Sequence, residues 1–258
     1  MTEIVSRRLT VGINAEARTI AIEGREGAAP GLFWLGGYRS EMVGTKAMAL
    51  DGYGAAHALA VTRFDYSGHG QSGGDFLDGT ISRWLEEALA VFALTQGAQI
   101  VIGSSMGGWL ALLLNRALRR AGPARVKALI LIAPAVDMTA DLMRPGFTPE
   151  ELRAMATRGV VEQPSEYSAT PYPITRKLIE DGDRHLLFTG AIETGCPITI
   201  LQGARDIDVP KEHALKLVSH LLSDPVTFTL VPDGDHRLSR EQDLRLLEAA
   251  VTRAVDGD

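Results

Sequence analysis

The stretch that decides the fold is IVIGSSMGGWL at residues 100–110, where an apolar run meets a Gly-Ser-Ser-Met-Gly turn and a second apolar run. The first run has the length and composition of a strand that is buried on both faces. The second run opens the segment WLALLLNRALRRAG, whose Arg119 and Arg120 favour the carboxyl end of a helix. The stretch therefore predicts a strand, a tight turn that carries Ser105, and a helix.

Several further short apolar runs repeat the strand pattern along the chain. They begin at Gly31, Ala60, Ala128, Pro197 and Val226. Helical patterns lie between them, among them segments that follow Thr80, Pro210 and Ser239. This alternation predicts an α/β architecture with right-handed crossovers, and residues 7–13 and 19–23 predict an antiparallel hairpin at one edge of the sheet.

The composition excludes several classes of protein. The 258 residues carry 26 Lys and Arg against 32 Asp and Glu, so the net charge is −6, and we expect no nucleic-acid partner. The lone cysteine, Cys196, cannot form an internal disulfide, which indicates a reducing compartment. The sequence has no run of about 18 apolar residues, and its first 20 residues have no apolar segment typical of a secretory signal, so we expect neither a membrane span nor a signal. We therefore expect a cytoplasmic location.

Residues 137–195 interrupt the alternation, because they contain no strand-like run and are too long for a structureless loop. One interpretation is a helical excursion packed on the sheet. The favoured one is a lid, because insertions at strand carboxyl ends lie where ligands bind. The apolar side chains that would cover an acyl chain, or simply pack the segment onto the sheet, are Met138, Leu142, Met143, Phe147, Met155, Tyr167, Tyr172 and Phe188.

Two serines occur in a Gly-x-Ser-x-Gly pattern, and their contexts differ. Ser105 lies directly between a predicted strand and a predicted helix, which is the setting of a nucleophile elbow. Gly103 and Gly107 flank it where side chains would clash. Ser72 lies in the glycine-rich loop GHGQSGG and is interpreted as a loop residue. We therefore expect Ser105 to be the nucleophile.

A serine hydroxyl needs a base and a group that orients the base. Asp206 is the first acid beyond the apolar run PITILQGARD and is preferred over Asp208 and Asp137. His236 follows the last predicted strand and is preferred as the base. The other histidines fall in helical patterns (His57, His213 and His220), in the segment 137–195 (His185), or in the loop GHGQSGG, where His69 could line the site.

An oxyanion hole requires two backbone N–H groups aimed at the charge that develops on the substrate. One is expected from Met106, directly after the nucleophile. The other is expected from Tyr38, in the turn that follows GLFWLGG, where Gly36 and Gly37 allow the backbone close to the substrate. Gly37, Trp109, Met143 and Tyr167 are the further candidates for contact with the substrate.

The stretches GYRSEMVGTKA, RFDYSGHGQSGGDF, GSSMGGWL, PSEYS, CPITILQGARDIDVP and DHRLS resemble the α/β-hydrolase superfamily. Within it they resemble the subfamily of mitochondrial palmitoyl-protein thioesterases, also described as acyl-glucuronide esterases. The resemblance implies one α/β-hydrolase domain over residues 1–258, with a mostly parallel eight-stranded sheet flanked by helices and a helical lid at 137–195. Gly36-Gly37 departs from the His-Gly or Pro-Gly of relatives, and we expect no counterpart of their mitochondrial targeting segment.

Together these features predict a serine esterase or thioesterase that uses Ser105, Asp206 and His236 and needs neither cofactor nor metal. Its expected partner is a small acyl ester or thioester, or an acylated protein. Two alternatives stay open. The same triad also serves amide, peptide or C–C bond cleavage, and a hydrolase fold can also bind a ligand without catalysis.

Overall fold

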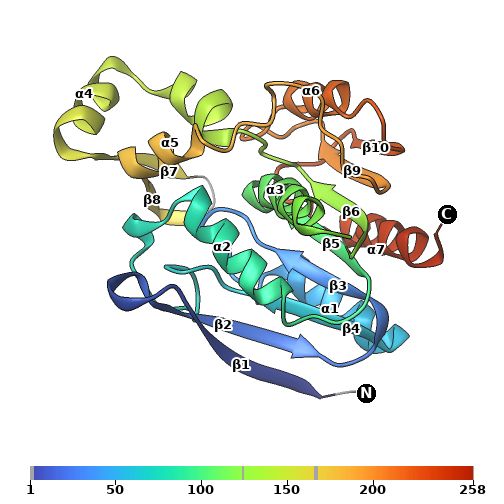
Figure 1. The fold of residues 1–258 in the computed structure, drawn as a ribbon. Helices are drawn as coiled ribbons and strands as arrows, with labels where there is room; N and C mark the ends of the chain where they lie inside the picture. The colour runs from blue at the N-terminus through green and yellow to red at the C-terminus, as the bar shows by residue number, and fades with distance from the viewer. Residues whose placement is uncertain (1–2, 124, 166–167, 258) are drawn as a thin grey trace.

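The structure, a computed structural model, describes residues 3–123, 125–165 and 168–257. An eight-stranded sheet forms its centre, in the order β1-β2-β4-β3-β5-β6-β9-β10 (Figure 1). In that order its strands are Ile4–Val11, Arg18–Arg25, Leu59–Phe64, Ala28–Leu35, Gln99–Ser104, Val126–Ile132, Ile198–Gly203 and Val226–Val231. β2 pairs antiparallel with β1 and with β4, and the other neighbours are parallel. The predicted α/β class and the N-terminal edge hairpin are therefore confirmed.

Helices cover both faces of the sheet. One face carries α2 (Ile81–Phe92), α3 (Met106–Ala121) and α6 (Lys211–His220), and the other carries α1 (Thr45–His57) and α7 (Glu241–Asp256) (Figure 1). Each face of the sheet buries an apolar core: the first core lies under α2, α3 and α6, and the second lies under α1 and α7. On β5, Val101 faces the first core, while Ile100 and Ile102 face the second. This burial on both faces explains why the strands read as nearly continuous apolar runs. Among the described helices, none is long and apolar enough to cross a bilayer.

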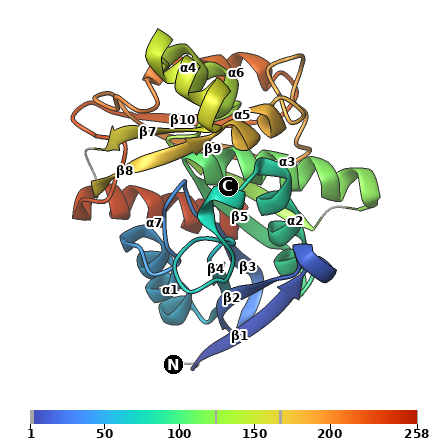
Figure 2. The same ribbon diagram turned by 90° about the vertical axis from the view of Figure 1, so that its left-hand side faces the viewer.

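The segment 137–195, called the insert below, leaves the sheet after β6 and returns to it at β9. It contains a short π-helical turn at Thr139–Met143 and a 3₁₀ turn at Arg144–Gly146. These are followed by α4 (Pro149–Arg158), β7 (Val160–Ser165), β8 (Ser168–Thr175) and α5 (Arg176–Gly182). Figures 1 and 2 show α4, α5 and the β7–β8 pair grouped together beyond the central sheet.

The prediction that the insert holds no strand was wrong, because β7 and β8 form an antiparallel two-stranded sheet. Its sequence hides this pairing, since Pro164, Pro171 and Pro173 interrupt the strand pattern. A two-stranded sheet uses the hydrogen bonds of one side of each strand only, so that proline is tolerated there. Val161 and Ile174 face each other across the pair and are buried.

The insert has a small apolar core of its own, separate from the two cores of the sheet. Its buried members are Phe147, Met155, Val161, Ile174 and Ile179. Polar contacts hold the two ends of the insert together and join it to the body of the molecule. Asp137 accepts the backbone N–H groups of Leu187 and Phe188, and Asp181 accepts the backbone N–H and hydroxyl of Ser82 at the start of α2.

Candidate active site

Ser105 lies between the last residue of β5 and the first residue of α3, in a backbone conformation with φ 54° and ψ −119°. This conformation is strained for a residue with a side chain. The flanking glycines make the turn sterically possible. A Cβ at Gly103 would lie 2.2 Å from the carbonyl oxygen of Gly107, and a Cβ at Gly107 would lie 2.1 Å from that of Leu35. The local sequence therefore has the geometry of a nucleophile elbow.

The structure brings Ser105, His236 and Asp206 into one hydrogen-bonded chain. Ser105 Oγ lies 3.0 Å from Nε2 of His236, and Nδ1 of His236 lies 2.8 Å from Oδ2 of Asp206. Asp206 follows β9 and His236 follows β10, so both side chains come from the carboxyl ends of neighbouring parallel strands. An ionised Asp206 accepts a hydrogen bond, so it fixes the proton on Nδ1 and leaves Nε2 to accept the serine proton.

Three donors besides His236 hold the carboxylate of Asp206. Its Oδ1 accepts the backbone N–H groups of Asp208 (3.0 Å) and Val209 (2.8 Å). The amide of Gln202, which is fully buried, lies 3.3 Å from Oδ2 and also donates to the carbonyl oxygen of Val209. The side chain of Asp206 has no solvent exposure, so these donors replace water around its charge.

The alternative acids and the alternative serine have other partners. Asp137 is occupied by backbone groups of the insert, as described above. Asp208 is exposed, although one of its carboxylate oxygens lies within 4.8 Å of the ligand atoms of Asp206 and His236. Ser72 donates to the carbonyl oxygen of Asp65 and accepts the N–H of Ala21, so it ties a loop to β2.

The remaining histidines also lie in other hydrogen bonds. The rings of His57, His213 and His220 pair with the carbonyl oxygens of Tyr53, Val136 and Gly190, and His185 pairs with Ser82. His69 is buried in the loop after β4, where its Nε2 lies 3.1 Å from the backbone nitrogen of Arg39. Its ring therefore contacts the turn after β3.

The turn after β3 lies directly beside Ser105. A Cβ at Gly37 would lie 3.3 Å from Cβ of Ser105, so the backbone passes the serine at close range. Met106 is the first residue of α3 and is buried. Its N–H has no carbonyl one turn earlier in the helix to accept it. This places the two expected oxyanion donors, Tyr38 and Met106, on the two segments that adjoin Ser105.

The side chain of Tyr38 connects this turn to the insert. Its hydroxyl donates to the carbonyl oxygen of Pro173, and its ring packs edge-on against Tyr172 of β8 and Phe76. The guanidinium of Arg39 lies over the rings of Phe76 and Tyr172, at 5.1 and 5.3 Å from their centroids. Burial raises the pKa of Tyr38, so the phenol keeps its proton and remains a donor.

The candidates for substrate contact have different surroundings. Gly37 adjoins Ser105, as described. Trp109 is fully buried and donates its indole N–H to the carbonyl oxygen of His185, so it presents no surface to a ligand in this structure. Met143 is half-buried and packs between the first core and the core of the insert. Tyr167 lies outside the described residues.

Asp206, Asp208 and His236 are close enough together to offer ligand atoms to a cation. Both ring nitrogens of His236 already lie in hydrogen bonds, to Asp206 and to Ser105. A metal ligand must give a free lone pair, so binding a cation here would break one of these hydrogen bonds. The donor set is therefore better suited to proton transfer than to metal binding.

Comparisons with known proteins give the chain its family. The family described as serine aminopeptidase, S33, matches residues 47–166. The human palmitoyl-protein thioesterase ABHD10, a mitochondrial protein, is 34% identical over 240 residues, which are 92% of this chain and 76% of that protein.

Two solved structures are similar along their whole length. A candidate hydrolase from Agrobacterium vitis S4 is 49% identical with a TM-score of 0.96, over 98% of this chain and 99% of that one. The mouse α/β-hydrolase domain-containing protein 10 is 30% identical with a TM-score of 0.85, over 98% and 99% of the two chains. The chain is thus a member of the α/β-hydrolase family to which the thioesterase ABHD10 belongs.

Proposed function

We propose that the chain is a serine hydrolase that cleaves carboxylic esters or acyl thioesters through an acyl-enzyme on Ser105. The observation that carries this proposal is the hydrogen-bonded chain from Ser105 through His236 to Asp206, at 3.0 and 2.8 Å. These distances are within the reach required for proton transfer from a nucleophile to its base.

In the proposed mechanism, Nε2 of His236 takes the proton of Ser105 as Oγ attacks the acyl carbonyl carbon. Asp206 stabilises the imidazolium that forms and holds the ring in place. The tetrahedral intermediate collapses when His236 gives this proton to the departing alkoxide or thiolate. Water then attacks the acyl-enzyme with His236 again as base, which releases the carboxylic acid and restores Ser105.

The N–H groups of Tyr38 and Met106 are proposed to bind the oxyanion of the tetrahedral intermediate. The support is the close approach of Gly37 to Ser105 and the position of Met106 at the first turn of α3. The positive end of the helix dipole of α3 also points toward this charge. Loss of one such donor from other serine hydrolases costs about 10²–10³ in kcat.

The insert is proposed to act as a lid over the acyl group. It supplies Tyr172, Met143 and Phe188 as partly buried apolar side chains, and β8 contacts the proposed oxyanion turn through Tyr38. The relatives named as palmitoyl-protein thioesterases act on acyl thioesters, which supports an acyl substrate on a small molecule or on a protein.

Amide or peptide hydrolysis is a second candidate, favoured by the description of the matching family as serine aminopeptidases. The triad is the same, but the leaving amine must be protonated before it can depart. The choice between the two functions therefore depends on the leaving group.

The test is a panel of substrates that share one acyl group and differ as p-nitrophenyl ester, thioester and p-nitroanilide. We expect turnover of the ester and thioester with kcat/KM at least about 100-fold above the anilide, and loss of this turnover in Ser105→Ala. A kcat/KM for the anilide equal to or above that for the ester would favour the peptidase, because such a site helps the poorer leaving group to depart, and ester turnover that survives Ser105→Ala would refute the assignment of Ser105.

A cytoplasmic location is part of the proposal, and its support is the single cysteine of the chain, Cys196, which cannot form an internal disulfide. The relatives are named as mitochondrial proteins, so mitochondria are the alternative location. Fractionation of cells that express the tagged chain distinguishes the two.

A further inference from the structure

His69 lies in the loop after β4 and is only 4% exposed, so its ring has to satisfy both nitrogens inside the protein. Nε2 lies 3.1 Å from the backbone nitrogen of Arg39, and Nδ1 lies 3.1 Å from the carbonyl oxygen of Ser67. An amide N–H can only donate and a carbonyl oxygen can only accept. The two partners therefore require the neutral ring with its proton on Nδ1.

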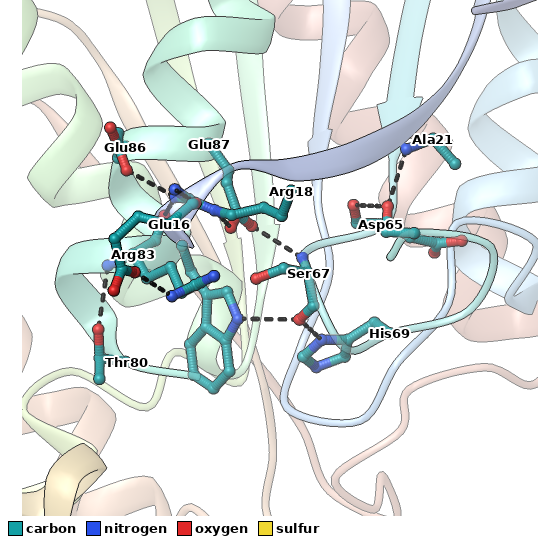
Figure 3. A network of polar contacts seen from close by, with 12 residues as sticks. Glu16, Arg18, Ala21, Asp65, Ser67, His69, Thr80, Arg83, Glu86 and Glu87 are labelled. Carbon is teal, nitrogen blue, oxygen red and sulfur yellow. Dashed lines mark hydrogen bonds and ion pairs between the residues drawn. The ribbon is translucent and has the colours of Figure 1, made fainter. Parts of the chain in front are cut away.

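A buried polar network holds the loop that carries His69 (Figure 3). The carbonyl oxygen of Ser67 also accepts the indole N–H of Trp84, and the N–H of Ser67 donates to Glu87 at 2.8 Å. Glu87 has no exposure and pairs with Arg18 at 2.6 Å. These contacts tie the loop that carries His69 to α2 and β2, which both bury side chains in the core of the sheet.

The residue that His69 contacts is itself in an unfavourable conformation. Arg39 has φ 56°, in the left-handed region, without being a glycine. It directly follows Tyr38, the proposed second oxyanion donor. A strained residue keeps its conformation only if its surroundings hold it there. The hydrogen bond from the Arg39 N–H to His69 is such a restraint, and the stacking of Arg39 on Phe76 and Tyr172 is another.

We propose that His69 is a positioning residue for catalysis, whose neutral ring fixes the Tyr38–Arg39 peptide, restrains the adjoining Gly37–Tyr38 peptide and so aims the Tyr38 N–H at the oxyanion formed on Ser105. This inference rests on the proposed function. His69 touches neither substrate nor the reacting atoms, and it acts through the backbone of the turn.

The charge state of the ring is consistent with this role. A protonated His69 would present a second donor to the Arg39 N–H and lose the hydrogen bond. Burial lowers the pKa of His69 to about 4. The charged neighbours Asp65 and Arg39 act in opposite directions, since Asp65 raises the pKa and Arg39 lowers it.

Two amide variants separate the two hydrogen bonds of the ring. In His69→Gln the side-chain carbonyl reaches the place of Nε2 and can accept the Arg39 N–H. In His69→Asn the shorter amide can replace Nδ1–H toward Ser67 but does not reach Arg39. The two variants are matched in polarity and both lose the ring, so they differ mainly in the contact to the turn.

We expect His69→Asn to lower kcat on a p-nitrophenyl ester by about tenfold or more while KM changes less than about twofold, because an oxyanion donor is misplaced. We expect His69→Gln to restore kcat to within about threefold of the unchanged chain. Thermal unfolding of both variants, and of His57→Gln at an exposed position of α1 as a control, separates this effect from a loss of fold.

Equal kcat for His69→Asn and the unchanged chain would overturn the inference. So would equal losses of kcat in the two amide variants, because then the hydrogen bond to Arg39 is irrelevant. The proposed function fails separately, if the unchanged chain turns over neither ester nor thioester, and the role of His69 then falls with it.

Discussion

The side chain of Asp206 determines which nitrogen of His236 carries the proton. Its Oδ2 accepts from Nδ1 at 2.8 Å, and burial leaves it no competing water. In Asp206→Asn the amide NH₂ can turn to Nδ1 and favour the wrong tautomer. We expect kcat on a p-nitrophenyl ester to fall by about 10³–10⁴ with little change in unfolding temperature.

The matched control for this prediction is Asp208→Asn. Asp208 is exposed and lies near the same histidine. Because Nδ1 already pairs with Asp206, we expect its removal to change kcat by less than about twofold, within the range of weak surface charge effects. A loss in Asp208→Asn as large as that in Asp206→Asn would mean that Asp208 is the orienting acid.

The lowered pKa of His69 predicts a pH dependence of stability. The ordinary pKa of 6.5 applies to the unfolded chain, whereas the folded value is about 4. Between these values the unfolded state binds a proton that the folded state does not, so stability falls as the pH falls through this window. The full loss in the free energy of unfolding across this window is about 3 kcal/mol.

Urea unfolding at pH 7.5 and at pH 4.5 measures this loss. His69→Gln has no titrating group at the position, so we expect it to lose less free energy of unfolding between the two pH values than the unchanged chain. If both chains lose the same free energy, His69 does not have the depressed pKa.

At the scale of elements, the strand β5, the elbow and helix α3 have to approach β3 closely. Gly107 makes this possible, since a Cβ there would lie 2.1 Å from the carbonyl oxygen of Leu35 and 2.6 Å from that of Gly36. We expect Gly107→Ala to lower the free energy of unfolding by about 1–3 kcal/mol. It should also lower kcat, because it pushes the oxyanion turn away from Ser105.

Gly52→Ala on α1 is the control for this prediction. A Cβ at Gly52 meets no atom within 4 Å, and alanine in a helix is more favourable than glycine by about 0.5–1 kcal/mol. Thermal unfolding and ester turnover should therefore show a neutral or stabilised, fully active Gly52→Ala. Gly107→Ala with unchanged unfolding and kcat would contradict the account of the elbow.

The features that the sequence predicted well are local ones. The strand-turn-helix at Ser105 is predictable because its parts follow one another within residues 100–110, and the proximity of Ser105, Asp206 and His236 is predictable because each residue follows a strand of the same sheet. The β7–β8 pair was missed because prolines hide its pattern. The role of Trp109 was not predictable from helix periodicity, since its partner His185 lies 76 residues away and only tertiary packing brings them together.

The contact of His69 with Arg39 likewise depends on tertiary packing and is not predictable from the sequence. The two residues belong to turns after different strands, and no spacing in the sequence relates them. The left-handed φ of Arg39 has no glycine to signal it. Such long-range hydrogen bonds to backbone groups require the fold to be known.

At the scale of the whole molecule, the insert is a partly independent unit that reaches the site through Tyr38. Its core is separate from the two cores of the sheet, and the Tyr38 hydroxyl joins it to the turn after β3. We expect Tyr38→Phe to speed amide hydrogen exchange in β7 and β8 by roughly 2- to 10-fold, which corresponds to the net free energy that one hydrogen bond contributes to stability.

Exchange in β5 and β6 is the internal control, because these strands lie in the centre of the sheet. Their protection should not change in Tyr38→Phe. Unchanged exchange in β7 and β8, or equal acceleration in all four strands, would show that the Tyr38 hydroxyl does not hold the insert.

The central claim is that Ser105 forms the acyl-enzyme. The most direct test is to mix the chain with a p-nitrophenyl ester, quench with acid within the first turnovers, and map the acylated peptide by mass spectrometry. The account predicts the mass of the acyl group on Ser105, and no adduct in Ser105→Ala. An acyl group on another residue, or steady ester turnover by Ser105→Ala, would contradict it.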